Sequence, residues 1–219
     1  MQDLARNGDR EGMAAFVMRM RAIGIDDKRL FSAMEMTPRR AFVPADYQSA
    51  VWSARTVPIA CGETLEGIDL QGRVLAALGP ADGQRVLEIG TGSGYATAVL
   101  ARLSGRVMSV ERFKTLLVDA QERLRTLGIA NVVLKHGDAE RAVEGEGPYD
   151  RIVVWAAFDA LPRNFTDLLS SGGVMICAIG PSEDEQLLVK LTKVGSRFER
   201  EDLGKVRFQP LVRGIAARL

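Results

Sequence analysis

The chain has 219 residues and a net charge of +1, from 29 lysines and arginines against 28 aspartates and glutamates. This balance argues against a dedicated nucleic-acid-binding protein, which normally carries a basic excess on one face. The 47% of hydrophobic residues exclude a mainly disordered chain. No apolar run approaches the roughly 18 residues of a membrane-spanning helix, and no signal-peptide core stands at the start. With two cysteines and no His/Cys cluster for zinc, we expect a cytoplasmic protein in a reducing compartment, without a metal.

The N-terminal part predicts two helices followed by a long irregular loop. Apolar residues recur at helical spacing up to Gly24, which is placed to end the first helix. A second helix is expected within residues 25–38, and it stops there because proline restricts the residue before it. Residues 42–70 contain several prolines and glycines and show no long period. We expect them to form loops and short turns over the main domain, where long loops are often functional.

From about Gln71 on, short apolar strands alternate with amphipathic helices, which indicates a parallel sheet covered on both faces. The expected strands are 85–89, 107–110, 132–134, 152–154 and 174–179, the expected helices are 96–103 and 116–127, and a C-terminal antiparallel strand pair is expected at 186–194 and 206–211. The predicted fold class is α/β, with a doubly wound, mostly parallel sheet. Residues 1–70 would form an N-terminal helical extension with a covering loop, and 71–219 the main domain of one compact unit.

The strongest motif is a glycine-rich junction between the first strand and the next helix. Gly90, Gly92 and Gly94 follow a GxGxG spacing, not the GxGxxG of dinucleotide sites. No Lys-Ser or Lys-Thr pair follows, which excludes a phosphate-gripping P-loop. Nucleotide-like cofactors bind at this point of doubly wound sheets. Glu88 precedes the first glycine by two residues, and a pocket of glycines and acids suits an adenosine that bears a positive sulfonium.

Two further acids follow the next strands. Glu111 ends the second strand, where a carboxylate is placed to accept both hydroxyls of a ribose. Asp138 ends the third strand and could accept from an adenine amino group, or it could cap the next helix. His136 is the only histidine, and no metal or nucleophile partner is apparent, so it is interpreted as structural.

Together these residues resemble the S-adenosylmethionine-dependent protein-L-isoaspartate O-methyltransferases. The resemblance extends over most of the chain and rests on residues 36–44, 86–95, 127–138, 149–162 and 206–211. It implies a seven-stranded methyltransferase fold, S-adenosylhomocysteine as product, and repair of isoaspartyl residues in damaged proteins. It also implies a set of cofactor-binding residues, namely Thr64, Glu88, Gly90, Gly92, Gly94, Glu111, Asp138 and Ala139.

Two places depart from the family pattern. The family's substrate loop reads roughly Gly-Gln-Thr-Ile-Ser-Gln-Pro, with the serine regarded as catalytic. Residues 62–68 read Gly-Glu-Thr-Leu-Glu-Gly-Ile here, so Glu66 stands at the serine position while Thr64 is retained. We expect Thr64 and Glu66 to face the methyl acceptor as candidate catalytic residues. After the fourth strand, Trp155 and Phe158 enter a loop expected near the transferred methyl; they could clamp a substrate or simply pack.

The glutamate at position 66 leaves open which chemical group accepts the methyl. An isoaspartyl acceptor is an ionised carboxylate, and a glutamate about 4 Å away would repel it by roughly 4 kcal/mol at an effective dielectric of about 20. Glu66 therefore points away or is protonated, or the acceptor is a hydroxyl or amine that profits from a carboxylate base. The alternatives to isoaspartyl methylation are a different small-molecule or protein acceptor, or a cofactor-binding relative without turnover. No nucleic-acid or membrane partner is expected, and the chain would be a monomer or weak homodimer.

Overall fold

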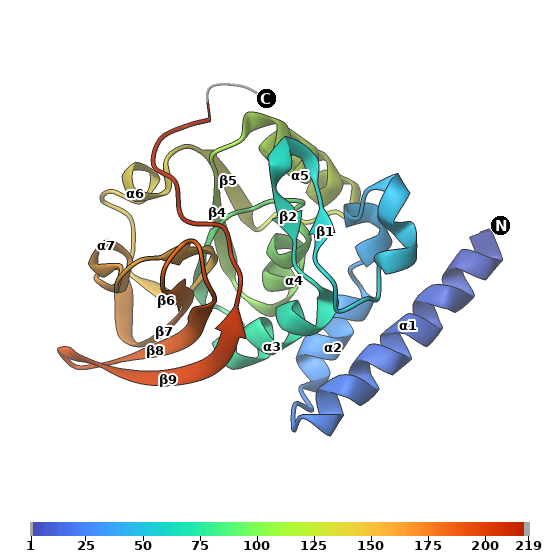
Figure 1. Ribbon diagram of the computed structural model, residues 1–219, viewed down its shortest axis with the longest axis horizontal. Helices are drawn as coiled ribbons and strands as arrows, with labels where there is room; N and C mark the ends of the chain where they lie inside the picture. The colour runs from blue at the N-terminus through green and yellow to red at the C-terminus, as the bar shows by residue number, and fades with distance from the viewer. Residues whose placement is uncertain (1, 217–219) are drawn as a thin grey trace.

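A seven-stranded sheet forms the centre of the computed structural model, which describes residues 2–216 (Figure 1). Its strands are β3 (Arg85–Ile89), β4 (Arg106–Glu111), β5 (Val132–His136), β6 (Tyr149–Phe158), β7 (Leu169–Ile179), β8 (Gln186–Val194) and β9 (Arg197–Val206). They are ordered β5-β4-β3-β6-β7-β8-β9. The pairs from β5 to β7 are parallel, whereas β8 and β9 are added antiparallel. The predicted fold class, a mostly parallel sheet with an antiparallel C-terminal pair, is confirmed.

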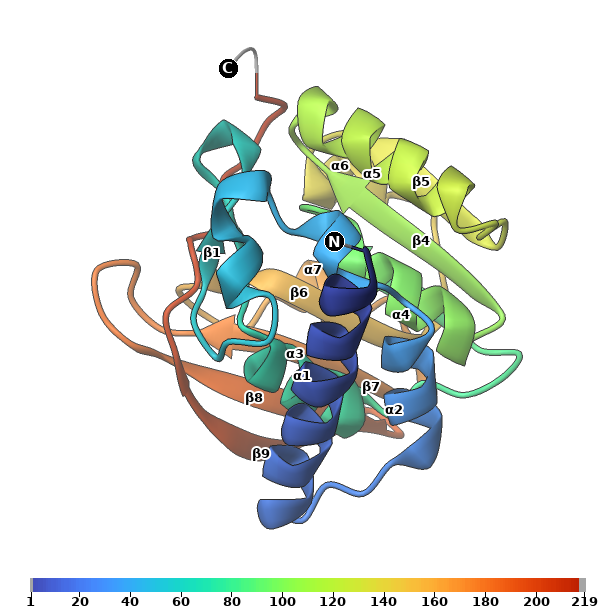
Figure 2. The same ribbon diagram turned by 90° about the vertical axis from the view of Figure 1, so that its right-hand side faces the viewer.

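Helices cover both faces of the sheet. They are α1 (Gln2–Ala22), α2 (Lys28–Glu35), α3 (Ile68–Leu78), α4 (Tyr95–Leu103), α5 (Lys114–Thr126), α6 (Ala139–Ala142) and α7 (Arg163–Thr166). On one face α3, α4 and α5 contact the strands, and α1 and α2 pack outside α3 and α4 (Figure 2). On the other face, α6 contacts β4 and α7 contacts β7. No helix within residues 2–216 is both long and apolar enough to cross a membrane.

The central strands are apolar on both faces because helices cover both. Successive side chains of a strand point to opposite faces, so neighbouring residues enter different cores. One core receives Val86, Val107, Val153 and Ile176. The other receives Leu87, Met108, Ile152 and Met175. This double burial explains why the strands read as short continuous apolar runs instead of alternating patterns.

The two predicted N-terminal helices are confirmed as α1 and α2. Asp27 caps α2 by accepting from the backbone N–H of Leu30 at 3.0 Å. Phe16 of α1 packs against Gly72 of α3, where an added Cβ would lie 2.6 Å from the phenyl ring. These helices share one hydrophobic core with the sheet. The division of the chain at residue 70 stays a prediction.

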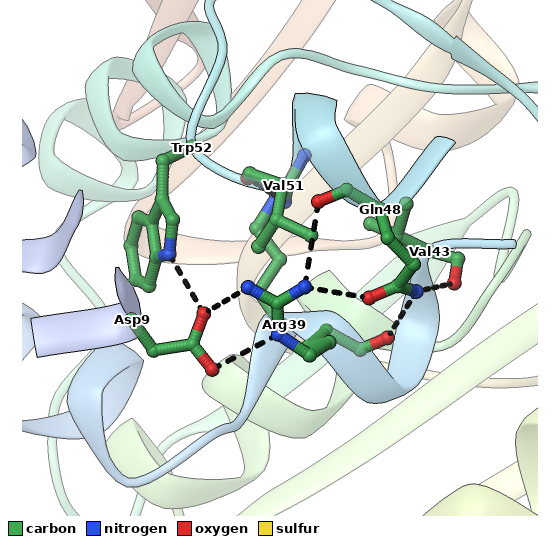
Figure 3. A network of polar contacts seen from close by, with 7 residues as sticks. Asp9, Arg39, Val43, Gln48, Val51 and Trp52 are labelled. Carbon is green, nitrogen blue, oxygen red and sulfur yellow. Dashed lines mark hydrogen bonds and ion pairs between the residues drawn. The ribbon is translucent and has the colours of Figure 1, made fainter. Parts of the chain in front are cut away.

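A polar network ties α1 to the segment that follows α2. Asp9 of α1 accepts from the Trp52 indole at 3.1 Å, from Arg40 Nε at 3.2 Å and from Arg40 Nη2 at 2.8 Å. Arg40 also donates to Gln48 at 2.9 Å, whose side-chain amide in turn donates to the Val43 carbonyl (Figure 3). The network crosses two short 3-10 helices, η1 (Arg39–Phe42) and η2 (Ala45–Ala50). It therefore fixes the chain just before the loop that carries the candidate acceptor residues.

That loop closes on itself at its base. The short strands β1 (Val57–Pro58) and β2 (Thr64–Leu65) pair antiparallel around η3 (Ala60–Gly62). At the base, Ile68 N donates to Ser53 O at 3.2 Å. Gly67 lies so close to Ala54 that an added Cβ would be 2.1 Å from its carbonyl oxygen. We call residues 53–67 the site loop.

Two of the predicted elements are wrong. Residues 68–70 were expected to be loop, but α3 starts at Ile68, and its buried face includes the polar Gln71 and the small Gly72, which hide the helical period. The last strand was expected at 206–211, but β9 is Arg197–Val206. β9 is rich in charged residues, as suits a strand at the edge of a sheet, so its sequence lacks the apolar signal.

Candidate functional site

A cavity of about 410 Å³ lies at the carboxyl ends of the parallel strands. We call it the crevice cavity. It is lined by residues that follow or end β3, β4, β5 and β6, among them Gly90, Glu111, Gly137 and Trp155. The next strands after β3 along the chain, β4 and β5, lie on one side of it, and β6 lies on its other side. The strand order therefore reverses at β3, and open α/β sheets bind ligands at such a switch point. A wider groove of about 780 Å³ between α3 and β8–β9 is lined by none of the motif residues.

Glu111 and the glycine loop form one wall of the crevice cavity. Gly90 and Gly92 have φ angles of +91° and +54°, a region that favours glycine. Glu111 is 5% exposed as a residue, and its carboxylate accepts from Gly92 N at 2.9 Å and from Phe113 N at 3.0 Å. Each carboxylate oxygen has two lone pairs. One on each oxygen therefore stays available for a ligand hydroxyl.

Glu88 lies beneath the glycine loop and lines neither this cavity nor the smaller one beside it. It is fully buried and accepts from Thr97 Oγ1, from Ser109 Oγ at 2.7 Å and from Trp155 Nε1 at 3.0 Å. Burial raises the pKa of Glu88 to about 7, against the opposing effect of these three hydrogen bonds. Ser109 also pairs with Thr91 of the loop at 2.6 Å. The structure thus places Glu88 under the loop, as its support.

Gly94 also lies outside the cavity linings. It caps the N-terminus of α4 with a φ angle of +87°. An added Cβ would lie 2.9 Å from the Ala120 Cβ of α5. Its position in the motif is therefore explained by close packing between α4 and α5.

We expect Gly94→Ala to lower the free energy of unfolding by about 2–4 kcal/mol. A positive φ costs a non-glycine residue roughly 1–2 kcal/mol, and overpacking costs roughly 1–3 kcal/mol more. Gly145→Ala is the matched control, because Gly145 has a φ of +72° but no atom within 4 Å of an added Cβ. Urea unfolding of both variants measures the difference. Equal losses would show that α5 yields to the new methyl group.

Asp138 caps α6, as one of its two interpretations held. Its carboxylate accepts from Glu140 N at 2.9 Å, from Arg141 N at 3.2 Å and from Gly214 N. The hydrogen bond from Gly214 lowers the pKa of Asp138, with burial opposing it. The side chain lines neither cavity, whereas the adjacent Ala139 lines the crevice cavity. Asp138 therefore joins α6 to the C-terminal segment in this structure.

The candidate acceptor residues Thr64 and Glu66 meet beside the glycine loop. Both line a second cavity of about 30 Å³, which we call the inner cavity. It shares Thr64, Gly90, Gly92 and Trp155 with the crevice cavity, so the two spaces adjoin. The Glu66 carboxylate accepts from Thr56 Oγ1 at 3.2 Å. Burial raises the pKa of Glu66, against the effects of Thr56 and of the Arg39 charge.

Several lining residues were not predicted as site residues. Glu63 faces the crevice cavity, and its pKa is raised by burial and by the Glu111 charge, with Arg112 opposing both. Residues 209–212 form the opposite wall. They are held there because Ala157 pairs with the backbone of this segment on both sides, at 2.8 Å each. Only the family resemblance of 206–211 hinted at this wall.

Trp155 and Phe158 were predicted in a loop after the fourth strand, but β6 extends to Phe158 and contains both. They have separate roles. Trp155 lines both cavities, and its indole donates to Glu88. Phe158 instead packs on Phe165 of α7, with 5.6 Å between ring centroids. Of the two, only Trp155 can contact a ligand. Cys61 lies on the site loop, and burial raises the pKa of its thiol, which disfavours a reactive thiolate.

Comparisons with known proteins show the family of this chain. The family model for protein-L-isoaspartate(D-aspartate) O-methyltransferase matches residues 11–216. A protein-L-isoaspartate O-methyltransferase of Rhizobium meliloti (strain 1021) is 43% identical over 202 residues, which cover 92% of this chain and 99% of the relative. A protein of the same name from Parvibaculum lavamentivorans is 41% identical and covers 91% of both chains.

A solved structure has the same architecture. It is a protein-L-isoaspartate O-methyltransferase from Plasmodium falciparum in complex with S-adenosyl-L-homocysteine, with a TM-score of 0.76 and 25% identity. The match covers 90% of this chain and 97% of that one. The family resemblance inferred from the motifs is confirmed. With residues 11–216 matched by the family model and relatives more than 40% identical over most of its length, the chain belongs to the protein-L-isoaspartate(D-aspartate) O-methyltransferase family.

Proposed function

We propose that this protein transfers a methyl group from S-adenosylmethionine to the side-chain carboxylate of isoaspartyl residues in proteins and peptides, as a step of their repair. The observation that carries the proposal is the Glu111 carboxylate, held by Gly92 N and Phe113 N at the edge of the crevice cavity. This is the arrangement that holds a ribose in cofactor domains of this kind. Family membership gives the reaction class.

The residues of the crevice cavity fit this cofactor. Its volume of about 410 Å³ falls within the roughly 300–1,000 Å³ of typical ligand sites. Glu63 and Glu111 line it, and Arg112 is the one basic residue among its described lining residues. A cavity with this charge suits a cation better than a polyphosphate. Gly90 and Gly92 leave the backbone open to close approach.

Each lining residue then has a role. Glu111 would accept from the ribose hydroxyls, while Thr64, Gly90, Gly92 and Ala139 would form walls around the rest of the cofactor. When bound, the cofactor supplies an electrophilic methyl group. Glu88, Gly94 and Asp138 would act indirectly, by holding the loop, α4 and α6 in place. Catalysis by this chain would rest mainly on positioning, because a carboxylate acceptor needs no general base.

Glu66 is compatible with a carboxylate acceptor when it is protonated. The raised pKa of Glu66 favours the neutral form relative to an exposed glutamate. A neutral carboxyl group does not repel the acceptor and can donate a hydrogen bond, as a serine hydroxyl can. A base for a hydroxyl or amine acceptor would need the ionised form, which burial disfavours. This favours isoaspartate over the other acceptors.

We expect purified protein to form methyl esters on an isoaspartyl peptide, and its activity to fall with rising pH as Glu66 loses its proton. Glu66→Gln and Glu66→Ser remove the charge at high pH, so their kcat/KM should exceed that of wild type by about 10- to 100-fold at pH 8.5, as expected for a charge roughly 6–8 Å away at an effective dielectric of about 20. As the pH falls and Glu66 takes up its proton, this difference should shrink. Assays with labelled S-adenosylmethionine and an isoaspartyl peptide measure kcat/KM for wild type and both variants.

The remaining outcomes separate the alternatives. Activity that appears only in Glu66→Ser would point to a changed acceptor, and tight cofactor binding without transfer to any acceptor would point to a relative without turnover. Failure to bind the cofactor would overturn the proposal. We further propose a cytoplasmic location, a monomer or weak homodimer, and no nucleic-acid or membrane partner.

A further inference from the structure

Arg39 has an unusual environment directly behind the inner cavity. Its side chain is 1% exposed. It donates to Val51 O at 2.9 Å, to Glu66 O at 2.6 Å and to the side-chain oxygen of Gln71. The guanidinium also stacks on the Tyr95 ring, with its Cζ 4.6 Å from the ring centroid. One side chain thus joins the site loop, α3 and α4.

The positive charge of Arg39 has no ion-pair partner among the described residues. Every hydrogen bond it makes goes to a neutral oxygen, and no carboxylate oxygen of residues 8–216 lies within 4.0 Å of it. Asp69 is nearby but pairs with Arg19 at 2.7 Å. Glu66 is the other nearby acid, but Arg39 binds its backbone oxygen, while its carboxylate accepts from Thr56. Arginine stays charged at neutral pH, so this is a buried cation without a direct ion pair, and burial lowers its pKa despite the charges of Glu66 and Asp69 farther away.

The wall in front of Arg39 offers free hydrogen-bond donors. Glu66, Gln71 and Tyr95, three groups that Arg39 contacts, all line the inner cavity. Ser93 lines it too, and the hydroxyls of Ser93 and Tyr95 are both buried without a hydrogen-bond partner. Unpartnered buried hydroxyls are rare and call for a ligand or a water. The volume of about 30 Å³ admits the oxygens of a small polar group and little else.

We infer that Arg39 is a positioning residue that gives the inner cavity a preference for a carboxylate, with the hydroxyls of Ser93 and Tyr95 as its free donors. The inference rests on the proposed function, in which two ligands carry a carboxylate. One is the amino-acid end of the cofactor, and the other is the isoaspartyl side chain. Either would reach the inner cavity through the crevice cavity, which shares four lining residues with it.

The test compares Arg39→Gln, which removes the charge, with Arg39→Lys, which keeps it. Arg40→Gln is the matched control, because Arg40 is the next residue and binds Asp9 and Gln48 away from both cavities. Calorimetry measures Kd for S-adenosylhomocysteine and for 5′-methylthioadenosine, which lacks the carboxylate. Initial rates give KM and kcat for an isoaspartyl peptide.

We expect Arg39→Gln to weaken the binding of one of the two carboxylate ligands by about 10- to 100-fold relative to Arg40→Gln. Arg39→Lys should recover most of the lost affinity. The Kd for 5′-methylthioadenosine should change by less than about threefold in both variants. A loss confined to S-adenosylhomocysteine assigns the cavity to the cofactor carboxylate. A rise confined to the peptide KM assigns it to the acceptor. Equal losses for 5′-methylthioadenosine, or no difference from the control, would overturn the inference.

Two smaller changes keep the test independent of folding. Ser93→Ala and Tyr95→Phe each remove one unpartnered oxygen, so thermal stability should hold or rise while carboxylate binding weakens. Tyr149→Phe is their control, because its hydroxyl contacts Met108 Sδ at 3.0 Å away from the site. Lower stability with unchanged binding would show a structural role only. If wild type binds no S-adenosylhomocysteine, the proposed function itself fails, which is a distinct result.

Discussion

Glu88→Leu should lower the free energy of unfolding by at least about 3 kcal/mol and abolish cofactor binding. Leucine would leave the donors of Thr97, Ser109 and Trp155 without their acceptor in a fully buried position. Each orphaned buried donor costs roughly 1–3 kcal/mol. Denaturant unfolding measures the loss. Glu88→Gln is the control, because an amide has nearly the same shape and the two hydroxyls can rotate to accept from it; we expect it to lie within about 1 kcal/mol of wild type at pH 7.

The same pair of proteins has an expected pH dependence. The pKa of Glu88 is about 7 in the folded protein, against 4.5 for an ordinary glutamate. The folded state therefore binds this proton more tightly than the unfolded state does. Its contribution to stability is full below about pH 4.5 and is lost as the pH rises through 7, by about 3 kcal/mol in all. Glu88→Gln lacks this titration. The stability of wild type relative to Glu88→Gln should therefore fall across this range, and a constant difference would show that Glu88 stays ionised.

The mostly parallel sheet could be predicted because its strands are apolar on both faces and its helices are amphipathic. The missed elements have the opposite character. The helix α3 buries Gln71 and Gly72, the first to bind Arg39 and the second to admit Phe16. Both choices reflect partners more than 30 residues away, which a local period does not contain. The edge strand β9 gains its place from pairing with β8, and its charged residues face solvent.

The site was predictable where a motif is local. The glycine loop and Glu111 follow directly from strand ends, since carboxyl ends of parallel strands meet at one edge of the sheet. The same motif also contains residues that hold the loop and α4 in place without lining a cavity. Glu88 and Gly94 sit among the binding glycines in sequence, but one lies under the loop and the other packs on Ala120. Spacing alone does not separate these roles, because both constrain the same short turn.

The walls that depend on tertiary contacts were harder to predict. Residues 209–212 reach the cavity only because Ala157 and Gly62 hold that segment, through backbone pairing and a 3.1 Å bond from the Gln209 side chain. Arg39 binds the Glu66 backbone oxygen, behind the inner cavity, from a segment 27 residues earlier in the chain. The acceptor side of this site is thus built from distant parts of the chain, whereas the ribose side is built from consecutive strand ends.

The second large effect is expected on cofactor affinity, when Glu111 on the ribose side is replaced. Glu111→Ala should weaken the binding of S-adenosylhomocysteine by at least about 100-fold, because two hydrogen bonds to a charged acceptor are worth roughly 1.5–3 kcal/mol each. It should also release Gly92 N and Phe113 N from their acceptor and loosen the loop. Glu63→Ala is the control, since Glu63 lines the same cavity but holds no backbone N–H; we expect a change of less than about fivefold.

The ligand without a carboxylate sharpens this prediction. 5′-Methylthioadenosine contains the ribose, so Glu111→Ala should weaken it as strongly as it weakens S-adenosylhomocysteine. The Arg39 variants, in contrast, should leave 5′-methylthioadenosine nearly unchanged, because their charge acts at the inner cavity. Calorimetry of both ligands with both sets of variants gives the comparison directly. If Glu111→Ala spared 5′-methylthioadenosine, Glu111 would not hold the ribose. The carboxylate that Gly92 and Phe113 fix would then serve the glycine loop alone.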